Sequence, residues 1–173
     1  MQTYKTLLGL SAVLFFALGM QSIASAKPSS PPPFTNILNE YAEVYAPNAG
    51  AGDELGRSIS IEGNFAVVGA PGFLNSAGHA VGAAYVYRFS GTSWTFMQQL
   101  VAFDGSAADQ FGGSVSIGGD GVIVVGAYED DHTTFGADSG SVYVYRYDFA
   151  SQLFLLEQKL ISGDANAGDI FGR

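Results

Sequence analysis

The stretch DQFGGSVSIGGDGVIVVGAYEDD, residues 109–131, decides the fold because the chain repeats its pattern. DELGRSISIEGNFAVVGAPGF begins at Asp53 with the same pattern, and DIFGR begins the pattern again at Asp169. The three opening aspartates are separated by 56 and 60 residues. Repeats of this length are typical of propellers and solenoids, in which each repeat is one structural unit that packs against its neighbours.

Each repeat contains four short segments with the composition of β-strands. The VVGA segments are almost continuously apolar, as in strands that are covered on both faces. The YVYR segments are rich in the aromatic and β-branched residues that favour strands, and glycine-rich turns lie between segments. No segment after the first 26 residues has a helical period. We predict strands at 58–61, 65–70, 83–89 and 94–101, and again at 114–117, 122–127, 141–147 and 153–161.

Four antiparallel strands per repeat predict an all-β fold built from β-propeller blades. The chain contains about two complete four-stranded meanders, whereas a closed propeller needs roughly 4 to 8 blades. Because the chain also ends within the third copy of the motif, we expect an incomplete propeller, cut from a longer protein. The alternative is a short chain that assembles its blades between subunits.

The repeated motif resembles the FG-GAP repeat, which forms the blades of the integrin α-chain head and of many bacterial exported proteins. The bacterial exported subtype is the more similar. The resemblance implies an integrin α-like β-propeller. Integrin blades often carry an Asp-x-Asp-x-Asp-Gly calcium loop before the GAP strand, but IEGN and GGDG stand there in this chain, so that calcium is not implied. The motif positions are Asp53, Leu55, Gly56, Gly69, Ala70, Pro71, Asp109, Phe111, Gly112, Gly126, Ala127, Asp169, Phe171 and Gly172.

Two interpretations are open for the motif residues. Phe111 and Gly112 could form a recognition motif, but we favour packing, in which the ring fills the gap between adjacent blades and glycine permits a tight backbone path. Leu55 keeps this bulk in the first repeat. The aspartates that head each motif could accept hydrogen bonds from backbone amides in a turn, or they could help to hold a cation.

The first 26 residues have the layout of a secretory signal peptide. Lys5 precedes an apolar run from Leu7 to Leu18, and Ala24-Ser25-Ala26 is a small-x-small cleavage site. The run is shorter than the roughly 20 residues of a membrane-spanning helix, although a membrane anchor is the alternative. We predict a signal peptide at 1–26, a Pro/Ser-rich linker at 27–38 and a propeller fragment at 39–173, with a strand of the preceding blade at 39–50, repeat 1 at 51–106, repeat 2 at 107–166 and the start of repeat 3 at 167–173.

Composition narrows the classes of partner. The chain carries 16 acidic and 7 basic residues, and its net charge of −9 disfavours nucleic acid and anionic membranes. It has no cysteine, so its stability comes from packing without disulfides. We expect a secreted or extracytoplasmic protein, in the periplasm or at the cell surface, with no membrane span after signal cleavage.

The loop YEDDHTTFGADSG contains the candidate metal ligands Glu129, Asp130, Asp131 and Asp138. Calcium prefers several carboxylate and carbonyl oxygens, which four acids in ten residues could supply. Their spacing does not match an EF-hand, and the equivalent loop of the first repeat, GFLNSAGHAVG, has no acid. We therefore favour a solvated acidic loop without metal, and calcium binding by these four residues is the alternative.

No catalytic constellation is visible in the sequence. His79 and His132 lie in loops without the companions of a known catalytic motif, and no GxxxxGK phosphate loop is present. We therefore expect a non-enzymatic binding or adhesion scaffold with no certain cofactor, whose loops contact a protein or a glycan. The alternative is the amino-terminal propeller of an exported enzyme, such as a hydrolase, with its catalytic domain outside this sequence.

Overall fold

A computed structural model describes residues 44–173 of the chain. The predicted signal peptide, the linker and residues 39–43 lie outside the described residues. The described part of the range predicted as a preceding strand, 44–50, contains a turn in which Ala49 N donates to Ala46 O at 3.1 Å. No helix among residues 44–173 is long and apolar enough to cross a membrane.

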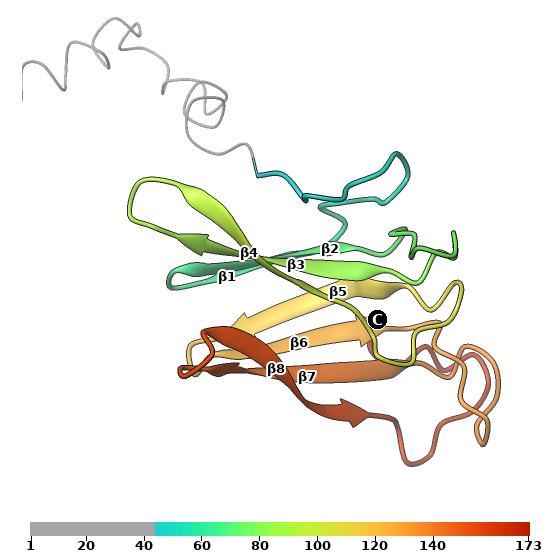
Figure 1. The fold of residues 1–173 in the computed structure, drawn as a ribbon. Helices are drawn as coiled ribbons and strands as arrows, with labels where there is room; N and C mark the ends of the chain where they lie inside the picture. Colours follow the sequence, from blue (N-terminus) through green and yellow to red (C-terminus); the bar gives the residue numbers. More distant parts are fainter. Residues whose placement is uncertain (1–43) are drawn as a thin grey trace, which may run out of the picture. The chain divides into compact units, whose positions relative to one another are not determined.

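The described chain forms two four-stranded antiparallel sheets, each a simple meander (Figure 1). We name the first sheet blade 1 and the second blade 2. Their arrangement confirms the predicted all-β fold of propeller-type blades. Blade 1 consists of β1 (Ile59–Glu62), β2 (Phe65–Ala70), β3 (Ala83–Phe89) and β4 (Trp94–Leu100). Blade 2 consists of β5 (Phe111–Gly118), β6 (Val122–Ala127), β7 (Ser141–Asp148) and β8 (Leu153–Leu160).

The strand register separates the residues that face each side of a blade. In blade 1, Val67 is paired with Ser60 and Val86, so these three side chains share one face. The strand bounds agree closely with prediction, except that β5 begins at Phe111 instead of residue 114. Phe111 pairs with Ala127 across a bulge before Ser114. The bulge adds two residues, Gly112 and Gly113, to β5, which the alternating pattern alone does not predict.

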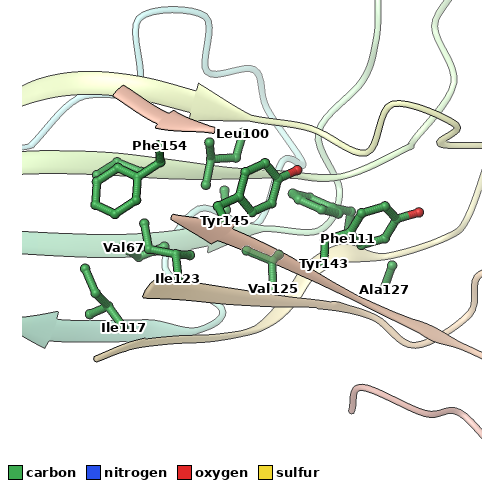
Figure 2. Close-up of a cluster of buried hydrophobic side chains, with 12 residues drawn as sticks. Val67, Leu100, Phe111, Ile117, Ile123, Val125, Ala127, Tyr143, Tyr145 and Phe154 are labelled. Carbon is green, nitrogen blue, oxygen red and sulfur yellow. The ribbon is translucent and has the colours of Figure 1, made fainter. Parts of the chain in front are cut away.

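The main hydrophobic core lies between the two blades (Figure 2). Val67 and Leu100 of blade 1 pack there with Phe111, Tyr143 and Tyr145 of blade 2. The ring of Phe111 lies 5.2 Å from that of Tyr143, in an edge-on arrangement that aromatic pairs favour. Each blade therefore uses a face that its neighbour covers, as the nearly continuous apolar strands require.

Polar side chains fix the alignment of the blades. Ser58 Oγ donates to Gly112 O at 2.8 Å, and Ile117 N donates to Ser60 Oγ at 3.1 Å. The amide of Gln98 donates to Phe154 O at 2.9 Å and accepts from Phe154 N at 2.8 Å. Hydrogen bonds form only within a narrow range of distances and angles. These contacts therefore fix the position of one blade relative to the other, which apolar packing alone would not do.

Candidate functional site

The aromatic–glycine motif lies in the contact between blades. Phe111 is fully buried, and Gly112 has φ 88°, with Ala83 O only 2.1 Å from where a Cβ would stand. A Cβ on Gly69 would lie 1.9 Å from Gly112 O. The FG of one repeat thus packs directly on the GA of the preceding blade. A recognition role would need an exposed ring, whereas this ring fills the core.

The third copy of the motif contacts blade 2 in the same way. Ser114 Oγ donates to Gly172 O at 2.7 Å, as Ser58 does to Gly112. Phe171 forms a parallel bridge with Gly140, matching the bridge between Phe111 and Gly82. In the first copy, the half-buried Leu55 packs against the smaller core beside Tyr85.

Each aspartate that heads a motif accepts a hydrogen bond from the backbone N–H of the residue three positions earlier in the chain. Gly50 N donates to Asp53, Ser106 N to Asp109 and Asn166 N to Asp169, at 2.6 to 2.7 Å. This is the geometry of a side chain that closes a turn. Burial, with the nearby charges of Asp130 and Asp131, raises the pKa of Asp109 to about 6.

A charged network lies in the loop region of blade 2. Lys159 Nζ is 2.7 Å from Oδ2 of both Asp104 and Asp130. The hydroxyl of Tyr143 donates to Asp104 Oδ1 at 2.7 Å, and Ser141 Oγ donates to the buried Asp130. Burial opposes charge on Asp104, but the hydrogen bonds from Lys159 and Tyr143 lower its pKa. Through Asp104, this network connects the segment between β4 and β5 to strands β7 and β8.

The structure does not bring the four predicted calcium ligands together. Asp130 is buried against Lys159, whereas Asp131 and Asp138 are exposed and joined through Asp138 N, which donates to Asp131 Oδ1 at 2.9 Å. Glu129 contacts Asp109 O through its backbone N–H. Among residues 44–173, no group of three or more His, Cys, Asp or Glu side chains is placed to hold a metal ion. Calcium binding at this loop stays a prediction.

The two histidines differ in their place, because His132 lines the same hollow as Asp104, Asp130 and Lys159, whereas His79 does not. His79 is exposed, and its backbone N–H donates to Asn75 Oδ1 at 3.1 Å. His132 Nδ1 accepts from Thr134 N at 3.2 Å, and its ring lies 4.9 Å from that of Phe135. His79 thus forms its hydrogen bonds through its backbone, whereas the ring of His132 contacts its own loop.

A second surface lies where the β1–β2, β5–β6 and β7–β8 turns of the two blades meet. A groove of about 590 Å³ opens between these turns, and we call it the hairpin groove. Phe149 at its edge is 85% exposed, the most exposed large apolar side chain among the described residues. Its lining includes Glu62, Phe65, Arg88, Asp120, Tyr147 and Phe149.

The charged groups of the hairpin groove are not paired with one another. The ion pairs within residues 44–173 use Arg57, Arg146 and Lys159 as cations. Arg88, Glu62 and Asp120 take part in none of these pairs. Arg88 instead lies over the ring of Phe65, 5.9 Å from its centre, which holds the guanidinium at the groove.

A neighbouring hollow of about 550 Å³ extends the hairpin groove along blade 1. The two hollows share Asn64 and Arg88, and the second also includes Ser90 and Thr95. Sequence reasoning missed this surface because its residues come from turns of different blades. The available signal was Phe149, an aromatic in a turn whose counterpart in blade 1 is SGTS.

Comparison with known proteins gives a family match. A family model described as FG-GAP repeat matches residues 38–87 and 94–145, which together cover more than half of the chain. The second match begins with β4 and ends inside β7, so it crosses from one blade to the next. No curated protein matches the sequence.

Proposed function

Because the chain belongs to the FG-GAP repeat family, we propose that it is an exported, non-catalytic scaffold that binds a protein or glycan partner through the hairpin groove. FG-GAP repeats form β-propeller-like interaction scaffolds. Export is inferred from the layout of residues 1–26, and the net charge of −9 favours partners other than nucleic acid.

The exposure of Phe149 is the observation that favours the hairpin groove over the repeated motif as the binding surface. The conspicuous motif residues are used for packing, since Phe111 is fully buried between the blades. Phe149 is the opposite case, because its ring stands in solvent at the edge of a groove. An exposed aromatic beside unpaired charged groups is the composition expected of a binding surface.

Export is tested by expressing the full chain in a bacterium and fractionating the cells. We expect the protein outside the cytoplasm, with an intact mass that corresponds to a first residue of Lys27. A full-length chain that begins at Met1 and stays in the cytoplasm would contradict the proposal.

Binding is tested with the fluorescently labelled exported chain on intact bacterial and yeast cells. We expect saturable binding that is largely lost in the double variant Phe149→Ala, Arg88→Gln. Phe103→Ala is the matched control, because Phe103 is also strongly exposed but lies outside the lining of the hairpin groove. Binding that is absent, or equally strong in the double variant, would contradict the assignment.

A further inference from the structure

We propose that the hairpin groove binds a neutral oligosaccharide, with a sugar ring against Phe149 and Tyr147 and its hydroxyls bonded to Arg88, Glu62 and Asp120. The inference rests on the proposed function, because it takes the hairpin groove as the binding surface. It adds the chemical class of the ligand.

The exposed aromatic is not required by the turn that carries it. In blade 1 the corresponding turn is small and polar, and Ser90 Oγ accepts a hydrogen bond from Ser93 N at 3.2 Å. In blade 2 the turn is closed by Asp148, which accepts from Ser151 N at 2.8 Å. Phe149 takes no part in that bond. The fold therefore leaves the ring available to a ligand.

Phe149 is nevertheless held in place by its neighbour. Its ring lies edge-on to Tyr147 at 5.0 Å and 86°, and Tyr147 packs in turn on Phe65 at 5.2 Å. A ring that is positioned before binding loses little conformational freedom when a ligand arrives. The apolar C–H face of a sugar ring suits the exposed face of the Phe149 ring, with the ring of Tyr147 standing perpendicular beside it.

The polar groups of the groove call for a ligand that both donates and accepts hydrogen bonds. Arg88 can only donate, whereas the ionised carboxylates of Glu62 and Asp120 can only accept. A sugar hydroxyl does both through one oxygen atom, so neighbouring hydroxyls can satisfy the guanidinium and a carboxylate together. The two carboxylates and the net charge of −9 disfavour a polyanionic glycan.

The shape of the surface favours a chain of sugars over a single one. The hairpin groove, at about 590 Å³, lies within the roughly 300–1,000 Å³ range of small-ligand sites. The adjoining hollow continues through Asn64 and Arg88 to Ser90 and Thr95. A linear oligosaccharide can therefore follow both hollows, with hydroxyl and amide side chains along the second.

The test is calorimetric titration of the purified chain with four neutral tetrasaccharides: cellotetraose, maltotetraose, mannotetraose and tetraacetylchitotetraose. Heparin tetrasaccharide and a neutral tetrapeptide serve as the alternative ligand classes. We expect saturable binding of at least one neutral sugar, weakened about tenfold or more by Phe149→Ala. Arg88→Lys should also weaken it, because lysine keeps the charge but lacks the planar fork. Phe103→Ala should leave the affinity unchanged.

Each other outcome overturns the inference. Binding of the peptide or heparin alone would assign the groove to another ligand class, and sugar binding unaffected by Phe149→Ala would place the sugar elsewhere. Failure of all four sugars while the labelled chain still binds cells through the groove would remove the saccharide but leave the scaffold function. A thermal melt of each variant checks folding, and the exposure of Phe149 predicts little change in stability.

Discussion

Blade 1 and blade 2 share one hydrogen-bond arrangement but differ in charge. In blade 1, the hydroxyl of Tyr85 donates to Asn48 Oδ1 at 3.0 Å, and the amide of Gln99 lies beside both groups. In blade 2, Tyr143 donates to Asp104 Oδ1 at 2.7 Å, and Lys159 takes the place of Gln99. Asn48 and Gln99 thus correspond to an ion pair in the second repeat.

The charged network of blade 2 joins two carboxylates, Asp104 and Asp130, to one lysine and to the hydroxyls of Tyr143 and Ser141. Asp130 stands where blade 1 has Phe73, whose ring lies 6.4 Å from that of Tyr85. Asp130 accepts from Ser141, where blade 1 has Ala83. A buried carboxylate needs such partners, because an unpaired one carries a large desolvation cost. The backbone and the tyrosine are therefore the same in both repeats. The side chains around the tyrosine hydroxyl are neutral in blade 1 and charged in blade 2.

The two blades also differ in how the same strand face is covered. Ile61 and Ile117 occupy equivalent positions, yet Ile61 is 60% exposed and Ile117 is 8% exposed. Blade 1 covers Ile117, whereas no described element covers Ile61. The same residue is therefore a core side chain or a surface side chain according to its neighbour, which is the nearest-neighbour logic of repeat proteins.

The largest expected effect comes from the motif phenylalanines. Phe111→Ala should lower the free energy of unfolding by about 4 kcal/mol, because it removes a fully buried ring from the core between the blades. Phe171→Ala is the matched change in the third motif, where the ring is 36% exposed, and should cost about 1 kcal/mol. Urea denaturation measures both. Equal losses of unfolding free energy in the two variants would show that burial between blades does not determine how much the motif phenylalanine stabilises the fold.

The charged network should give the next largest difference. Lys159→Met leaves Asp104 and Asp130 together without their cation, so we expect a loss of about 3 kcal/mol in unfolding free energy. Gln99→Met, at the equivalent position of blade 1, should cost about 1 kcal/mol or less because it removes neutral hydrogen bonds. The same denaturation experiment compares them. A smaller loss for Lys159→Met than for Gln99→Met would refute the comparison.

The sequence predicts the strands well and the networks poorly, for a physical reason. Strand positions follow from local alternation and from glycine turns, and two copies of VVGA and YVYR give the pattern twice. The Lys159 network joins residues 104, 130 and 159, whose proximity depends on the packing of three segments. Phe149 and Arg88 meet at one groove for the same kind of reason, since they belong to different blades. The one local indication of the Lys159 network was that charged residues stand in repeat 2 where repeat 1 has neutral ones.

Acidity should affect the two blades differently. The pKa of Asp109 is raised to about 6, above the roughly 3.9 of an unfolded aspartate. The folded state therefore binds the proton more tightly, so stability rises as pH falls through 6 and the gain is complete below about 4. Between pH 7 and pH 5 this group should add about 1 kcal/mol.

Asp109→Asn should remove this pH dependence, since the amide oxygen can still accept from Ser106 N without a charge to titrate. Asp53→Asn is the matched change in blade 1, and because it keeps the Asp109 carboxyl, the rise in stability on acidification through pH 6 should persist. Thermal melts at pH 7, 6 and 5 provide the measurement. A pH dependence that survives Asp109→Asn would assign it to other groups.

The smallest expected effect is that of calcium on the loop of blade 2. A site would stabilise the fold by roughly 2.7 kcal/mol at a calcium concentration ~100 times the dissociation constant. We expect a much smaller shift, because Asp130 is already paired with Lys159 and no group of three or more acids or histidines among residues 44–173 is placed to hold a metal ion. Changing Asp130 is a poor test, since that change also breaks the ion pair with Lys159.

The sharper variant is Asp131→Asn with Asp138→Asn. Asparagine keeps the acceptor for Asp138 N and tolerates the φ of 54° at residue 138, so the folded loop should persist while two charges are lost. Calcium titration by calorimetry should give no saturable heat with either the original chain or this variant. A saturable calcium heat that the double variant abolishes would instead establish a metal site in the loop. The two blades would then differ in a bound cation as well as in the Lys159 ion pairs.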